Sequence, residues 1–129
     1  MKEVRAKGGK PVLVSENVRG TFDADDKLFD RVDKKGISLS CYAQAMREMS
    51  EELKTEFVDM NKLTHDLLVK LGKEEALKFY VISSGTIDPK TGKPSTDTNH
   101  TVRAGAEAYA RLFLEDVKRR NLAIAEIFK

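Results

Sequence analysis

The chain has 129 residues, a length that suits one domain with a single modest core. Hydrophobic residues make up 40% and charged residues 34%, a globular balance that excludes a disordered chain. No apolar run approaches the ~20 residues of a membrane-spanning helix. The 23 basic and 21 acidic residues are interleaved and leave a net charge of +2, so charge predicts neither a nucleic-acid nor a membrane partner.

The first residues are typical of the last turns of a helix. Val4 is apolar, Lys7 lies near the carbonyl end, and Gly8 or Gly9 supplies a left-handed residue before a strand. The opening lacks the apolar core of a signal peptide. We therefore expect residues 1–129 to be one partial domain, a fragment of a longer protein. Cys41 is the single cysteine, so no internal disulfide forms.

Two short apolar runs predict strands. The run from Pro11 to Ser15 is continuously apolar and β-branched, which favours a strand buried on both faces. A second strand is expected from Thr55 to Met60. Between them, the polar stretch from Glu16 to Ser38 predicts a long loop, and loops of that length are often functional.

Helices are expected around and between the strands. A first helix follows Ser38 or Ser40, and its apolar face is expected to consist of Tyr42, Ala45, Met46, Met49 and Leu53. A second begins after Asp59 or Asn61 and ends at Gly72.

The remainder of the chain predicts two further helices and a loop. Residues 73–82 favour a short helix, and residues 83–97 form a loop marked by Asp-Pro and Gly-Lys-Pro turn signals. A last helix starts near Thr101. Strands that alternate with helices predict an α/β fold with parallel strands. Two strands are too few for a complete doubly wound sheet, so further strands are expected upstream.

The candidate active site is the pair Asp97 and His100, three residues apart at the start of the last helix. On such a turn the Asp97 carboxylate can accept a hydrogen bond from one imidazole nitrogen and leave the other free. A Ser-His-Asp hydrolase requires this couple. The alternative is structural: Asp97 or Thr98 caps the last helix, and His100 is a solvated residue of its first turn.

Other candidates are weaker. His65 lies off the leucine stripe of its helix and is expected on the surface. Two histidines and one cysteine give no zinc-binding spacing, and no cofactor motif is present. Ser15 ends a strand, where α/β folds place site residues, but no nucleophile elbow or Gly-Asp-Ser turn surrounds it.

Four stretches together resemble a known family. They are "EVRAKGGKPVLVSENVRGTFD", "YAQAMREMSEEL", "FVDMNKLTHDLLVKLG" and "DTNHTVRAGAEAYARLF". In this order they are similar to the C-terminal half of rhamnogalacturonan acetylesterases, members of the SGNH (GDSL-like) hydrolase superfamily. The resemblance implies a flavodoxin-like three-layer α/β/α fold, of which this chain supplies about two parallel strands and four helices.

The resemblance also implies an activity, the removal of acetyl groups from pectic rhamnogalacturonan. The family's Asp-x-x-His motif corresponds to Asp97, the orienting carboxylate, and His100, the general base and later general acid. The family's Gly-Asp-Ser and Gly-x-Asn-Asp-like motifs are absent from this sequence, and Thr101 stands where the family usually has an aromatic residue. Arg19, in the long loop, is the expected sugar contact. The parent enzyme is expected to be secreted or periplasmic.

Two hypotheses follow. The first is the C-terminal portion of a carbohydrate acetylesterase, inactive alone because it lacks a nucleophile, whose partner is an acetylated pectic polysaccharide. The second is a non-catalytic α/β interaction module. Under both, the strand from Pro11 to Ser15 has an unpaired edge that favours a homodimer or higher oligomer.

Overall fold

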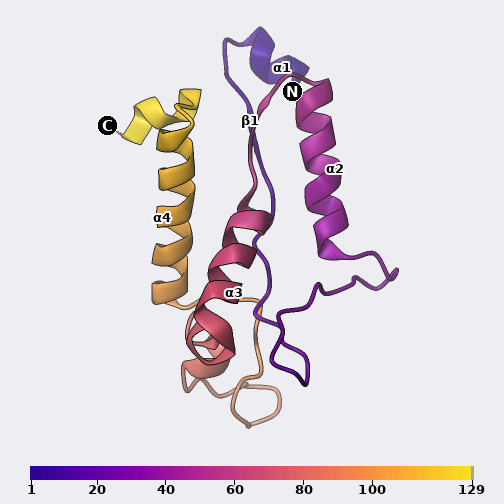
Figure 1. Cartoon of the computed structure of the whole chain (residues 1–129), viewed down its shortest axis with the longest axis vertical. Coiled ribbons are helices and arrows are strands. Elements are labelled where there is room, and N and C mark those ends of the chain that lie inside the picture. The colour runs from indigo at the N-terminus through magenta and orange to yellow at the C-terminus, as the bar shows by residue number, and fades with distance from the viewer. Residues whose placement is uncertain (129) are drawn as a thin grey trace.

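The structure, a computed structural model, describes residues 1–128, which form four α-helices, two short 3-10 helices and two strands (Figure 1). The elements in chain order are α1 (Lys2–Ala6), β1 (Val12–Val14), α2 (Leu39–Glu52), β2 (Glu56–Val58), α3 (Met60–Leu77), η1 (Val81–Ser83), α4 (Arg103–Arg119) and η2 (Ala123–Phe128). The predicted α/β class and order of elements are confirmed. Gly8, at φ 76°, is the left-handed residue expected after the first helix.

The two strands pair in parallel, as predicted. Leu13 lies opposite Phe57, in the middle of a register of three residue pairs. The expectation that the first strand is buried on both faces is wrong, because Val14 is 40% exposed. Among the described residues, β1 has β2 as its only neighbouring strand, so its other edge and part of its surface face solvent.

Helices cover both sides of the strands. α2 packs against β1 and β2, whereas α4 packs against β2 and α3, and Figure 1 shows α2 and α4 on opposite sides of β1. The predicted apolar face of α2 is only partly right: Met46 and Leu53 are half-buried, but Tyr42 and Met49 are 42% and 48% exposed, and Ala43 and Ser50 are the buried residues. These two small side chains face the strands and allow the helix backbone to approach them closely.

α3 begins as expected and bends where its end was expected. The Asp59 carboxylate caps the helix by accepting a hydrogen bond from the Lys62 backbone N–H, at 3.0 Å. Gly72 has φ 75° and ψ 167°, which interrupts the helix before a further turn. The predicted helix over residues 73–82 is wrong beyond Leu77, because Tyr80 is extended and bridges Thr101.

The loops carry short antiparallel bridges. Residues 16–38 form the predicted long loop, in which Phe22 bridges Leu28 and Val32 bridges Ser38. The N-cap position of α4 is Val102, and no side chain caps the helix. The interpretation of Asp97 or Thr98 as its cap is therefore wrong.

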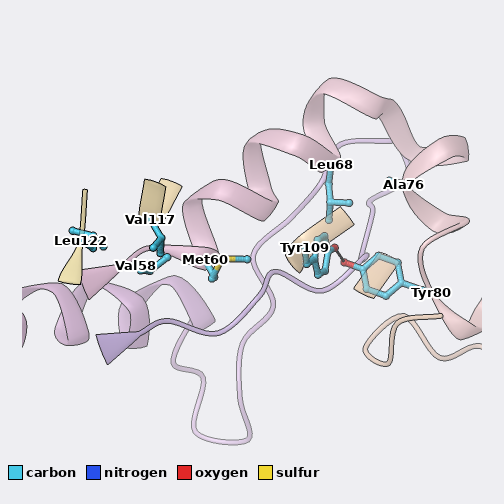
Figure 2. Packing of buried hydrophobic residues seen from close by; sticks show 8 residues of the cluster. All are labelled: Val58, Met60, Leu68, Ala76, Tyr80, Tyr109, Val117 and Leu122. Carbon is cyan, nitrogen blue, oxygen red and sulfur yellow. Dashed lines mark hydrogen bonds between the residues drawn. The ribbon is translucent and has the colours of Figure 1, made fainter. Parts of the chain in front are cut away.

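Eight of the buried apolar side chains form one cluster that joins β2, α3 and α4 (Figure 2). Its members are Val58, Met60, Leu68, Ala76, Tyr80, Tyr109, Val117 and Leu122. The tyrosine pair lies at the end of this cluster away from β2, with the two hydroxyl groups in contact. Within the described residues, no helix combines the length and the apolarity needed to cross a membrane.

Candidate active site

Asp97 and His100 contact each other through a turn that the Asp97 side chain organises. Asp97 Oδ1 accepts hydrogen bonds from the backbone N–H groups of Asn99 (2.7 Å) and His100 (2.9 Å). The second oxygen, Oδ2, lies 2.6 Å from His100 Nδ1. Nδ1 is therefore the nitrogen that carries the proton in the neutral ring, and Nε2 keeps its lone pair free for a proton. The His100 side chain is 75% exposed, so a substrate can reach it.

These hydrogen bonds keep the Asp97 carboxylate ionised. The backbone N–H of His100, its imidazole and the backbone N–H of Asn99 lower the pKa of Asp97 to about 2. Because that pKa is far below neutral pH, the carboxylate is ionised there and can stabilise an imidazolium ion. The couple is chemically able to take a proton from a hydroxyl group and return it to a leaving group.

Three backbone hydrogen bonds hold the turn from outside. The carbonyl of Asp97 accepts from the Ile82 N–H at 2.8 Å, and that of His100 accepts from the Val81 N–H at 3.0 Å. The carbonyl of Thr98 accepts from the Gly20 N–H at 3.0 Å. The turn is thus fixed both to η1 and to the loop that follows β1.

Tyr80 connects these two supports. It immediately precedes Val81, and a Cβ atom added at Gly20 would overlap its ring. Its hydroxyl lies 2.8 Å from the Val18 carbonyl oxygen and 2.6 Å from the Tyr109 hydroxyl. Burial raises the pKa of both phenols. Sequence reasoning missed Tyr80, since "KFYVI" has the apolar character of a helix and no local signal shows its distant partners.

Arg19, the expected sugar contact, precedes Gly20 and is half-buried. Among residues 1–128, its guanidinium group makes no hydrogen bond or ion pair. Its neighbour Gly20 bonds to the carbonyl of Thr98, so the structure brings this part of the loop to the Asp97–His100 turn. A role in sugar binding stays a prediction.

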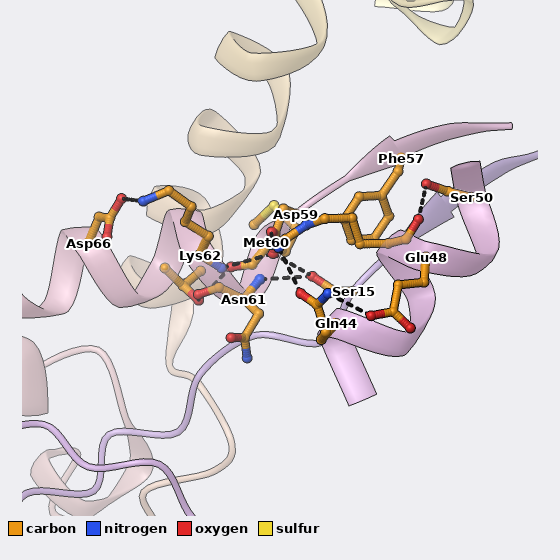
Figure 3. A network of polar contacts seen from close by, with 12 residues as sticks. Ser15, Gln44, Glu48, Ser50, Phe57, Asp59, Met60, Asn61, Lys62 and Asp66 are labelled. Carbon is orange, nitrogen blue, oxygen red and sulfur yellow. Dashed lines mark hydrogen bonds and ion pairs between the residues drawn. The ribbon is translucent and has the colours of Figure 1, made fainter. Parts of the chain in front are cut away.

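The Ser15 hydroxyl forms hydrogen bonds with residues at the start of α3. The residue is 4% exposed, and its Oγ accepts the Asn61 backbone N–H at 2.9 Å and donates to Asp59 Oδ1 at 3.3 Å (Figure 3). Arg47 pairs with the other oxygen of Asp59. The hydroxyl therefore joins the end of β1 to the first turn of α3, and within residues 1–128 no hydrogen bond connects it with His100.

The second histidine has a different environment. The His65 side chain is 51% exposed, as predicted, and its Nδ1 lies 3.5 Å from Asp66, a distance too long for a firm hydrogen bond. In the part of the chain that the structure describes, no group of three or more His, Cys, Asp or Glu side chains has the arrangement of a metal site.

Comparisons with known proteins point to esterases. The chain is 28% identical to the uncharacterized esterase YxiM of Bacillus subtilis, over 95% of this chain and 27% of that protein. It is 25% identical to the rhamnogalacturonan acetylesterase RhgT of the same organism, over 95% of this chain and 50% of that protein. The chain therefore spans half or less of the length of these relatives. No protein-family profile matches it.

A solved structure agrees with the sequence comparisons. The crystal structure of YxiM superposes with a TM-score of 0.67 at 28% identity, over 95% of this chain and 29% of that one. The chain thus shares its overall α/β fold with a protein named as an esterase. The chain is a homologue of the esterase YxiM and of the rhamnogalacturonan acetylesterase RhgT, shares the SGNH-type α/β fold of YxiM, and corresponds to part of the length of both proteins.

Proposed function

We propose that this chain supplies the Asp-His part of the Ser-His-Asp triad of a serine carbohydrate esterase that removes acetyl groups from pectic rhamnogalacturonan. The observation that carries the proposal is the 2.6 Å contact between Asp97 Oδ2 and His100 Nδ1 on an exposed turn. The similarity to RhgT, a rhamnogalacturonan acetylesterase, supports the substrate class. The nucleophile is not among these 129 residues, which contain no Gly-Asp-Ser motif.

In this reaction His100 Nε2 accepts the proton of a serine hydroxyl as its oxygen attacks the acetyl carbonyl carbon. Asp97 holds the ring through Nδ1 and stabilises the positive charge that develops on it. His100 then protonates the sugar oxygen, which leaves as a hydroxyl group. A water molecule, deprotonated by the same nitrogen, releases acetate and regenerates the serine. The products of the two half-reactions are acetate and a free sugar hydroxyl.

Alone, the 129-residue chain is expected to hydrolyse no aryl acetate and to react with no fluorophosphonate probe, because both reactions need an activated serine. The direct test restores that serine. A chimera in which this chain replaces the matching half of RhgT is expected to release acetate from acetylated rhamnogalacturonan.

In that chimera, His100→Ala is expected to lower kcat by about a thousandfold or more, and Asp97→Asn by a similar order. His65→Ala is the matched control, since it removes the other histidine and is expected to leave kcat unchanged. A folded, active chimera that is insensitive to His100→Ala would overturn the proposal. Circular dichroism of each variant separates loss of chemistry from loss of fold.

A further inference from the structure

The backbone of Val18, in the loop after β1, is held by two buried hydroxyl groups. Its N–H donates to Thr64 Oγ1 at 3.0 Å, and its carbonyl accepts from the Tyr80 hydroxyl at 2.8 Å. Two residues later, the Gly20 N–H donates to a carbonyl of the Asp97–His100 turn. The segment over residues 18–20 therefore joins Thr64, on α3, to the candidate active site.

The Thr64 hydroxyl is oriented by its own helix. The residue is completely buried, and its hydroxyl donates to the Met60 carbonyl, one turn earlier in α3, at 2.7 Å. A hydroxyl group has one proton and two lone pairs, so Oγ1 keeps a lone pair for the Val18 N–H. Because the side chain is buried, water does not take its place, and loss of the hydroxyl would leave that N–H unpaired.

The segment over residues 18–20 has little freedom to absorb a change at Thr64. Val18 and Gly20 are separated by a single residue, and a Cβ atom added at Gly20 would lie 2.4 Å from the Tyr80 ring. A displacement of Val18 is therefore passed to the Gly20 N–H and to the Thr98 carbonyl that accepts it. The two hydrogen bonds from η1 would remain, so the turn would lose accuracy rather than its fold.

We infer that Thr64 is a positioning residue for the Asp97–His100 couple, and that it acts through the backbone of residues 18–20. Within the described residues, Thr64 forms no hydrogen bond with the turn itself, and its burial keeps it from the substrate. Its effect on catalysis rests on the proposed function, whereas its effect on the turn exists in the 129-residue chain alone. The competing explanation is that Thr64 only stabilises the fold, as any buried hydrogen bond does.

Two variants separate the hydroxyl from the shape of the side chain. Thr64→Val removes the hydroxyl and keeps the branched shape, and Thr64→Ser keeps the hydroxyl. Ser15→Ala is the matched control, because it also removes a buried hydroxyl that accepts a backbone N–H at the start of α3 but has no bond to residues 18–20. Circular dichroism checks the fold of each variant, and Thr64→Ala repeats the loss of the hydroxyl if valine is not accommodated.

The first readout is the His100 ring in the isotope-labelled 129-residue chain, at a pH where the ring is neutral. NMR chemical shifts of its two nitrogens report which of them carries the proton. We expect Thr64→Val to lower the fraction protonated at Nδ1 and to accelerate hydrogen exchange at Gly20, relative to global unfolding, by about tenfold. Thr64→Ser and Ser15→Ala are expected to stay within about twofold. The His65 ring, next to Thr64 in α3, is the internal reference for a general disturbance of the helix.

The second readout is the chimera with RhgT. Thr64→Val is expected to lower kcat about tenfold and to leave KM within about twofold, with recovery in Thr64→Ser, because a misplaced catalytic group slows the reaction without weakening substrate binding. Equal changes in Thr64→Val and Ser15→Ala would overturn the inference, as would an unchanged His100 ring and Gly20 exchange rate in Thr64→Val. Failure of the proposed function appears separately, as an active chimera insensitive to His100→Ala, and leaves the measurements on the 129-residue chain valid.

Discussion

The hydroxyl group of Tyr109 donates a hydrogen bond to that of Tyr80, 2.6 Å away. The direction follows from a third partner: the Tyr80 hydroxyl donates its only proton to the Val18 carbonyl, which can only accept. The pair joins α4 to the loop after β1, next to the Gly20 N–H that holds the Asp97–His100 turn.

The two hydroxyl groups are expected to contribute unequally to the free energy of unfolding. Tyr109→Phe removes one donor and leaves the bond from Tyr80 to Val18 intact, so we expect a loss of about 1 kcal/mol in the free energy of unfolding. Tyr80→Phe leaves the Val18 carbonyl and the Tyr109 hydroxyl both unpaired, and we expect a loss of about 3 kcal/mol. Urea denaturation measures both values.

Tyr80→Phe should also loosen the turn. Hydrogen exchange at the Gly20 amide is expected to accelerate relative to global unfolding in Tyr80→Phe. Val117→Ala, a cavity variant in the same buried cluster, is the control for general destabilisation. The exchange rates of the two variants are compared under conditions that give them the same free energy of unfolding. If Gly20 then exchanged equally fast in both, Tyr80 would have no particular role at the turn.

Asp97 is expected to make stability depend on pH in a defined interval. Its pKa is about 2 in the folded chain and 3.8 as the reference value, so the folded state binds the proton less readily. The contribution of Asp97 to the free energy of unfolding is therefore complete above pH 3.8 and is lost as the pH falls toward about 2. Asp97→Asn should remove this part of the pH dependence, measured as the midpoint of urea denaturation at each pH. Asp25→Asn, a surface aspartate, serves as the control.

Ser15 is expected to matter for stability and not for chemistry. Ser15→Ala removes the acceptor of the Asn61 N–H at the start of α3, and we expect a loss of about 1 kcal/mol in the free energy of unfolding. No fluorophosphonate adduct should form on Ser15 in the native chain, because its hydroxyl is buried and bonded to Asp59. Mass spectrometry after incubation decides this, and an adduct at Ser15 would identify a nucleophile within the chain.

The outer edge of β1 is expected to pair with another chain. The Ser15 N–H donates to Val58, so the alternating Val14 N–H points away from β2. Val14 is also an exposed apolar side chain on this edge. We therefore expect a homodimer or higher oligomer of the 129-residue chain at micromolar concentration.

Light scattering measures the oligomer, and Val14→Pro tests the edge. Proline removes the outward N–H and keeps the β1–β2 pairing, so this variant is expected to shift the chain toward monomer. Val69→Ala, on the exposed surface of α3, is the control and should not change the mass. A monomeric parent chain would contradict the expected association.

Much of the fold depends on short-range signals and was therefore predictable. The cap at Asp59, the bend at Gly72 and the hairpin turns follow from residues a few positions apart. The contact between Asp97 and His100 is of the same kind, since three residues separate them on one turn. The resemblance to acetylesterases added the expected role of the pair, which the chain's own spacing leaves open.

The tertiary structure decided the features that join distant segments. Periodicity predicted that Tyr42 and Met49 would be buried, but the side of α2 that faces the strands presents Ala43 and Ser50. Likewise, the environments of Ser15 and Tyr80 depend on partners 44 and 62 residues away, respectively. A local pattern defines an element and its turns, because these depend on neighbouring backbone groups. Which face is covered, and which hydroxyl is engaged, depends on how the elements pack together.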